Sequence, residues 1–302
     1  MMNNFVFENK TKVYFGKGGV KEYLGCLLGN YGETVMLAYG GGSIKRNGVY
    51  DEIMGILNAQ GKCVVEFSGI MSNPTYAKAQ EGAVITHEEK KIKGALWGAQ
   101  AEFAFLDPAY SLSVPMQQVI SGAFDTLSHA METYFGKPDE NNLSDDINEA
   151  VMRSVIRNIR ILLTDPENYD ARSELAWASA MAENGVLKIG KVTDFQAHQI
   201  QHQLGAYTDC NHGAGLAVIH PVLYRHIYKS ARRGSPAGRR TSGALRPRAV
   251  TGRPRLPVST RWPRLLRKSV CRPALQSLAS PPTPTSAPWR ILPTSPLAAA
   301  KS

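Results

Sequence analysis

The chain has 302 residues, a length that suggests two domains, and a net charge of +10. Residues 229–302 hold 16 Lys/Arg and no Asp/Glu, whereas residues 1–228 hold 19 basic and 25 acidic residues. The part of the chain expected to fold is therefore mildly acidic. The four cysteines are scattered and form no CxxC motif, and the sequence shows no signal peptide and no apolar run of 18 residues. These features predict a cytoplasmic protein without a membrane span.

The first 70 residues alternate strand and helix patterns. Residues 4–7 and 12–16 are expected to be short strands, and residues 20–29 an amphipathic helix. Residues 34–43 form an apolar run that ends in glycines, as buried parallel strands do, and a helix over 47–61 and a strand over 62–69 follow. This order of strand, helix and strand predicts a βαβ unit.

The alternation stops after a further expected helix that begins near Pro74. Residues 83–108 offer one or two strands and end at Asp107–Pro108, and from Met116 to Tyr228 the pattern is almost entirely helical, with Ser144 as the expected N-cap of one helix. We therefore expect an α/β domain over 1–108 and an all-α domain over 109–228. Twelve of the 18 prolines lie in residues 229–302, which predicts a disordered tail.

Two pairs of polar side chains on separate expected helices point to a metal. Asp125 and His129 are four residues apart, and His198 and His202 have the same spacing, so each pair projects from one helix face. His212 follows beyond a short bend. One carboxylate and several imidazoles suit Fe(II) or Zn(II), although either pair alone could be an ordinary surface or core pair.

These motifs resemble the iron-containing (group III) alcohol dehydrogenases, and the butanol dehydrogenase branch in particular. The similar stretches include "YGGGSIKRNGVYD", "GAFDTLSHAMETYF" and "AHQIQHQLGAYTDCNHGAGLAVIHP", and the resemblance covers residues 1–228. It implies an incomplete α/β dinucleotide-binding domain over 1–108, followed by an all-α metal-binding domain over 109–228, in a dehydroquinate synthase-like architecture, and a homodimer. It also implies an NAD(P)-linked dehydrogenase of short to medium primary alcohols, with His202 lining the substrate site and four metal ligands: Asp125, His129, His198 and His212.

The glycine turn at residues 40–43 is the expected nucleotide contact. By the resemblance, Gly40, Gly41 and Ser43 would face the adenosine ribose, with Lys45 available to a 2′-phosphate. Because no acidic residue follows the strand to bind a ribose diol, the sequence favours NADP(H) over NAD(H). As a bare motif, the turn fits a structural strand–helix connection equally well.

The chain departs from the family pattern in two places. The second glycine-rich turn and the segment beside the nicotinamide have no counterpart, as if βαβ units had been lost near Ala83, and the sequence diverges after Tyr228. We expect a damaged gene, with an in-frame loss and a later frameshift, and impaired activity. The alternatives are a metal-binding protein without a redox role and a nucleic-acid-binding protein that uses its basic tail.

Overall fold

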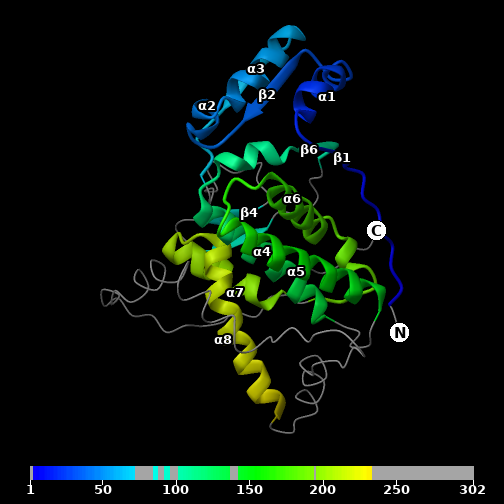
Figure 1. Ribbon diagram of the computed structural model, residues 1–302, viewed down its shortest axis with the longest axis vertical. Helices are drawn as coiled ribbons and strands as arrows, with labels where there is room; N and C mark the ends of the chain where they lie inside the picture. Colours follow the sequence, from blue (N-terminus) through cyan, green and yellow to red (C-terminus); the bar gives the residue numbers. More distant parts are fainter. Residues whose placement is uncertain are drawn as a thin grey trace, which may run out of the picture.

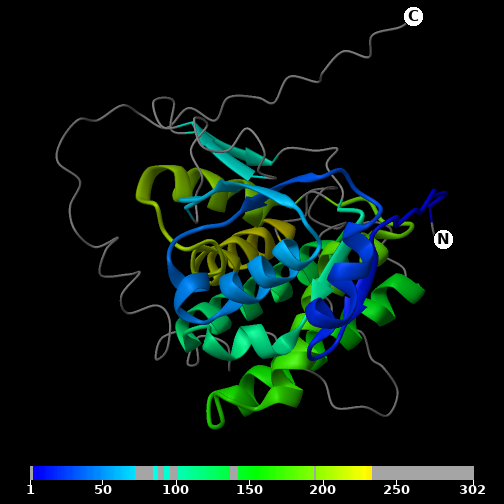
Figure 2. The same cartoon turned by 90° about the horizontal axis from the view of Figure 1, so that it is seen from above.

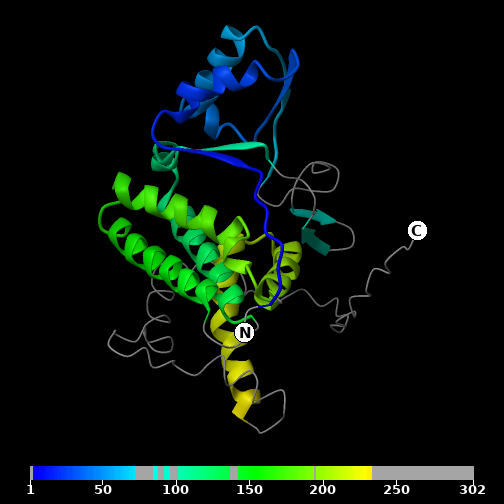
Figure 3. The same ribbon diagram turned by 90° about the vertical axis from the view of Figure 1, so that its right-hand side faces the viewer.

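The computed structural model describes residues 3–71, 84–87, 92–95, 101–136, 142–193 and 195–232. An N-terminal α/β lobe lies at one end of the molecule and a helical domain at the other, with strands β1 and β6 between them (Figures 1 and 3). The order of the two parts agrees with the sequence prediction. None of the described helices is long and apolar enough to cross a membrane.

The N-terminal lobe contains the expected βαβ unit. Strand β2 pairs in parallel with β3, from Thr34↔Cys63 to Ala38↔Phe67, and β1 pairs in parallel with β6. Glycines with positive φ, at Gly18, Gly48 and Gly61, lie at helix ends, where the backbone conformation suits glycine. The elements are β1 (Lys12–Phe15), α1 (Gly19–Leu28), β2 (Thr34–Ala38), α2 (Ser43–Arg46), α3 (Val49–Ala59) and β3 (Cys63–Phe67).

Two expectations for this lobe were wrong. Residues 4–7 form no strand, because they have no hydrogen-bonding partner strand; Val6 is fully exposed. Strand β2 is half exposed rather than buried, with Met36 48% exposed. The reason is that the β1–β6 and β2–β3 pairs form separate two-stranded sheets, so no further described strand covers their edges.

Residues 83–108 contain three strands where one or two were expected. Strands β4 (Val84–His87) and β5 (Ile92–Ala95) form an antiparallel hairpin, and β6 (Phe103–Leu106) completes the pair with β1. The hairpin lies beside helix α7 of the helical domain (Figures 2 and 3). The expected helix after Pro74 and the expected deletion point at Gly82–Ala83 lie outside the described residues.

The helical domain confirms the expected helices, with one correction at a cap. Asn142, not Ser144, caps the second long helix by accepting a hydrogen bond from the Asp145 N–H at 3.1 Å. Ser144 is buried inside the first turn and donates to the Ile189 carbonyl at 2.6 Å. The helices are α4 (Met116–Tyr134), α5 (Leu143–Leu162), α6 (Tyr169–Glu183), α7 (Gln196–Thr208) and α8 (His212–Arg232), with short 3-10 turns over Pro108–Ser113 and Val186–Lys188.

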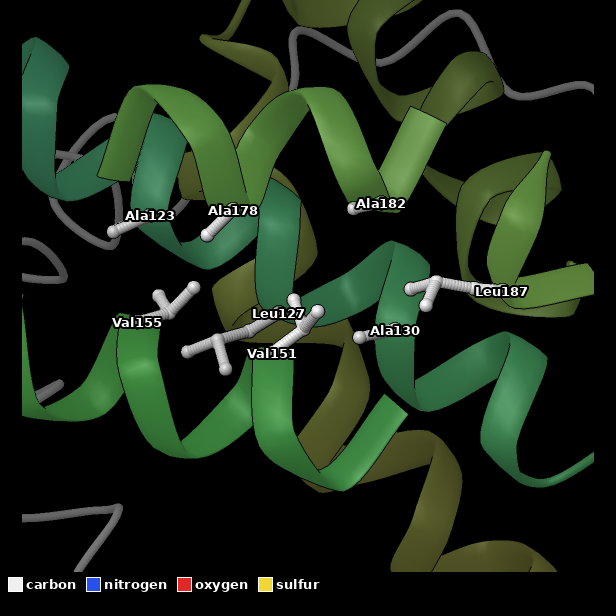
Figure 4. Packing of buried hydrophobic residues seen from close by; sticks show 8 residues of the cluster. All are labelled: Ala123, Leu127, Ala130, Val151, Val155, Ala178, Ala182 and Leu187. Atoms are coloured by element: carbon white, nitrogen blue, oxygen red, sulfur yellow. The ribbon is translucent and has the colours of Figure 1, made fainter. Parts of the chain in front are cut away.

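Helix α4 has two buried faces with different chemistry. Ala123, Leu127 and Ala130 recur at helical spacing and pack against α5, α6 and Leu187 (Figure 4). Asp125 and His129 are each two residues further along than a core position, which rotates them by about 200° to the opposite face. Helix α8 packs against α4, and α7 packs against α8. One helix therefore joins the apolar core to the polar site.

Candidate metal centre

The short connection between α7 and α8 brings the histidines of these two helices together. Asp209, in the left-handed region at φ 53, ends α7, and Asn211 then caps α8. The Asn211 carbonyl accepts from the Gly215 N–H at 2.9 Å, and its side-chain oxygen accepts from the Ala214 N–H at 3.1 Å. The connection is so short that His212, the first residue of α8, lies beside the face of α7 that carries His198.

Three imidazole nitrogens surround one carboxylate oxygen. Nε2 of His129 lies 3.5 Å from Oδ1 of Asp125, and the Nε2 atoms of His198 and His212 each lie 3.6 Å from it. The Nε2 atoms of His129 and His198 are 2.9 Å apart. The structure thus brings together all four residues that the resemblance implied as ligands. Asp125, His198 and His212 form the tightest group, with ligand atoms all within 4.8 Å of one another.

These spacings fit a divalent transition-metal ion. Metal–ligand bonds of about 2.0–2.1 Å at tetrahedral angles hold the ligand atoms about 3.4 Å apart. The observed 3.5–3.6 Å separations are close to that value. Oδ1 of Asp125 is also buried without a hydrogen bond, which is costly for a carboxylate unless a cation offsets it.

The ionisable groups of the centre shift one another's pKa values. Burial raises the pKa of Asp125, but its interactions with His198, His212 and His129 outweigh this and hold the pKa below its usual value. Burial alone would lower the pKa of His198, but the carboxylates of Asp125 and Glu132 raise it to about 9. The carboxylates and imidazoles of the centre therefore stabilise one another's charged forms.

His202 lies at the edge of the centre rather than within it. Its ring centroid is 5.5 Å from that of His212 and 6.4 Å from that of His198, whereas the rings of His129 and His198 are 4.2 Å apart. It occupies the next turn of α7 after His198. This position fits a residue lining the space beside the ion.

Four further residues of the centre were missed by the sequence analysis. Glu132 and Gln201 hydrogen-bond to Nδ1 of His198 and of His212, and Oε1 of Glu183 lies 2.6 Å from Nε2 of His129. The Phe195 ring packs against His129 and His198, and its backbone is strained at φ 47. Glu132 and Gln201 could have been found, since each lies three residues from a ligand on the same helix. Glu183 and Phe195 carry no such signal.

The predicted nucleotide turn follows β2, and Lys45 is engaged there. Its Nζ lies 4.3 Å from the centroid of the Tyr50 ring and 3.7 Å from Oε2 of Glu66. Tyr50 donates to the other oxygen of Glu66 at 2.7 Å. Ser43 and Gly41 are exposed beside this cluster, whereas a Cβ on Gly40 would come within 3.0 Å of the Ile70 carbonyl. A side chain at position 40 would therefore be tightly packed against that carbonyl.

The α/β lobe is of the nucleotide-binding type, although it is incomplete. The helical domain that follows it carries a centre of three histidines and one carboxylate. Together they define a metal-binding protein with a nucleotide-type domain. The iron-containing alcohol dehydrogenase model matches residues 10–96, and the model of the C-terminal part of the Fe-containing alcohol dehydrogenase family matches residues 119–241. The chain belongs to the iron-containing alcohol dehydrogenase family.

The relatives place the chain beside the butanol dehydrogenase branch. NADH-dependent butanol dehydrogenase B of Clostridium acetobutylicum is 30% identical over 75% of this chain and 76% of its own length. An NADPH-dependent aldehyde reductase of Escherichia coli is 27% identical over 74% of this chain and 76% of its own length. The crystal structure of NADH-dependent butanol dehydrogenase A from Thermotoga maritima superposes with a TM-score of 0.72 at 27% identity, over 81% of this chain and 82% of that chain.

The alignment with the Clostridium enzyme also contains a large gap. It spans 297 positions but uses 75% of the 302 residues, about 227, which leaves about 70 positions of the relative without a residue of this chain. A loss of that size corresponds to about two βαβ units. This supports the expectation that a segment of the family sequence is missing from this chain.

Proposed function

We propose that the protein is a metal-dependent, NAD(P)-linked alcohol dehydrogenase or aldehyde reductase acting on short to medium primary alcohols. The observation that carries this proposal is the convergence of three imidazole nitrogens on the unbonded oxygen of Asp125 at 3.5–3.6 Å. The butanol dehydrogenase and aldehyde reductase relatives supply the substrate class. Neither alternative from the sequence, a redox-inactive metal protein or a nucleic-acid-binding protein, is favoured by these relatives.

The four ligands in this proposal are Asp125, His129, His198 and His212. The ion is Fe(II) rather than Zn(II), because four protein ligands leave an open position only on an ion that exceeds four-coordination. When bound, the ion supplies Lewis acidity toward an alcohol or aldehyde oxygen, and the nicotinamide supplies the hydride chemistry. His202, at the edge of the centre, holds a proton at a ring nitrogen and passes it to or from the substrate oxygen.

The glycine turn in this proposal holds the adenosine end of the cofactor through Gly40, Gly41 and Ser43. The sequence favoured NADP(H) because no acidic residue follows the strand to bind a ribose diol, and Lys45 was available to a 2′-phosphate. The closeness of Glu66 to Lys45 changes that expectation, since the carboxylate offsets the cation and repels a phosphate. We therefore propose NAD(H) as the better-bound cofactor, with NADP(H) as the weaker one.

Activity is expected to be low. A turn that holds a pyrophosphate does so with several charge-assisted hydrogen bonds of about 1.5–3 kcal/mol each, so losing three or four weakens binding by several orders of magnitude. The second glycine turn of the family has no counterpart in this sequence. The family's habit of forming homodimers is proposed for this chain as well and can be checked by light scattering.

The test combines metal content with turnover. Iron-reconstituted protein is assayed for oxidation of NADH and NADPH with butanal, beside an intact butanol dehydrogenase. We expect about one equivalent of bound metal and turnover far below that of the intact enzyme. A chain that binds no metal would refute the metal centre. Metal without any nicotinamide binding would instead favour the redox-inactive alternative, and turnover within tenfold of the intact enzyme would show that the cofactor is held by residues not identified above.

A further inference from the structure

Helix α7 begins without a cap of its own. Phe195 precedes its first residue and offers no side-chain acceptor to the free N–H groups of the first turn. Glu132, from α4, takes that role. Its Oε1 accepts from the Ala197 N–H at 2.6 Å, and its Oε2 accepts from the His198 N–H at 3.3 Å. These are the second and third N–H groups of the helix, which an N-cap side chain normally satisfies.

The same carboxylate also holds the imidazole of His198. Oε2 of Glu132 hydrogen-bonds to Nδ1 of His198, whose Nε2 faces Asp125. Glu132 is 5% exposed, so it makes these contacts away from water. A carboxylate can only accept, so Nδ1 must carry the hydrogen, and the neutral form of the ring that binds a metal then has its lone pair on Nε2.

We propose that Glu132 is a positioning residue that fixes both the start of helix α7 and the metal-binding tautomer of His198. The inference rests on the proposed metal centre. Glu132 is not one of the four proposed ligands; its oxygens face the first turn of α7 and Nδ1 of His198. Partners of this kind tune metal affinity by about 10- to 100-fold in metalloproteins.

Glutamine at position 132 tests the two roles together. Its amide oxygen can accept from the backbone N–H groups or from Nδ1–H, but its NH2 group must then face the other donor. With the oxygen toward the backbone, the NH2 group selects the His198 tautomer with hydrogen on Nε2, which cannot coordinate. Glu132→Asp keeps the charge and shortens the side chain by one methylene, so it should retain more affinity than Glu132→Gln.

The matched control is Asp145→Asn. Asp145 is an equally buried carboxylate in the same domain, but its charge is paired with Lys191 at 2.5 Å. Cobalt(II) binding is measured by visible absorption in competition with a chelator, and thermal unfolding is followed without metal. We expect Glu132→Gln to bind cobalt 10- to 100-fold more weakly than the unmodified chain, and Asp145→Asn to lower the unfolding temperature with unchanged affinity.

A double-mutant cycle shows whether Glu132 acts through His198. In a His198→Ala background, Glu132→Gln should weaken cobalt binding no further, whereas in a His212→Ala background it should keep its full effect. Unchanged affinity in Glu132→Gln, equal losses in Glu132→Gln and Asp145→Asn, or an undiminished effect in the His198→Ala background would each overturn the inference. An unmodified chain that binds no cobalt would overturn the metal centre itself, before any variant is compared.

Discussion

Oε1 of Glu183, at the last residue of α6, lies 2.6 Å from Nε2 of His129, the nitrogen assigned to the ion. A carboxylate this close to a cation attracts it, although Glu183 is half exposed and the attraction is screened. We expect Glu183→Gln to weaken cobalt affinity by about 3- to 10-fold, equivalent to about 1 kcal/mol. A tighter complex in the variant would show instead that Glu183 competes with the ion for His129.

His198 and His202 occupy successive turns of the same helix but differ in their relation to Asp125. His198→Ala removes a nitrogen that faces the centre, so metal content should fall by more than about 100-fold. His202→Ala should change it less than about threefold, while lowering turnover. Metal analysis of both purified variants checks this. Equal loss of metal from the two would refute the assignment of His202 as a non-ligand.

Gly213 has no room for a side chain. A Cβ there would lie 2.0 Å from the Ser121 carbonyl oxygen on α4. Gly213→Ala must therefore displace the start of α8 and move His212, at a cost of about 1–3 kcal/mol. Gly122→Ala, on α4 and with nothing within 4 Å of the added Cβ, is the control and should be neutral or stabilising. Urea unfolding and cobalt affinity measured on both variants test this, and similar results for the two would contradict it.

His220 should make stability fall in mild acid. Burial lowers its pKa to about 4, against about 6.5 in the unfolded chain. Between these values the unfolded state binds a proton that the folded state does not, so stability present above pH 6.5 is lost as the pH falls toward 4. For His220 alone, the loss between pH 7.5 and pH 5.0 is about 2 kcal/mol.

The measurement is urea unfolding at both pH values with a chelator present, for the unmodified chain and for His220→Gln. The variant lacks this titration, so its stability should fall by about 2 kcal/mol less over the same interval. Parallel losses in the two proteins would show that His220 is not held neutral by burial.

The charge on Glu66 should set cofactor preference. Glu66→Gln keeps an acceptor for Tyr50 but removes the anion 3.7 Å from Lys45, so the variant should shift the ratio of NADPH to NADH affinity upward by about 3- to 10-fold. Fluorescence titration with both cofactors measures the ratio. Glu52→Gln, which alters a carboxylate bonded to Tyr110, is the control of equal charge change. The same shift in both variants would contradict a local effect of Glu66.

Regular helical spacing let the sequence predict which polar residues share a helix face, whereas the choice of four ligands came from the resemblance to the family. Asp125 and His129 share a face at four residues' separation, and extending that face by three residues reaches Glu132. Glu183 could not be predicted in this way, because its place beside His129 depends on how α6 packs against α4. Periodicity reports which residues of one helix lie together, but not which helix ends meet.

The errors in the predicted fold have the same origin. Asn142 and Ser144 are both good N-cap residues. The Ser144 hydroxyl instead donates a hydrogen bond to the Ile189 carbonyl, 45 residues away, and Asn142 caps the helix. Residues 4–7 alternate like a strand, yet a strand also needs a neighbour to accept its hydrogen bonds. In both cases, contacts with residues distant in the sequence determine which of two locally possible conformations forms.

The two faces of α4 link ion occupancy to the unfolding equilibrium of the helical domain. A ligand that binds only the folded chain adds a stabilising free energy that grows with its concentration, about 2.7 kcal/mol at 100 times its dissociation constant. Because Asp125 and His129 share a helix with Ala123, Leu127 and Ala130, that free energy acts on the same cooperative unit as the apolar core. The concentration of available metal would then set the fraction of chains that are folded. The melting temperature would report the occupancy of the site even where no turnover can be detected.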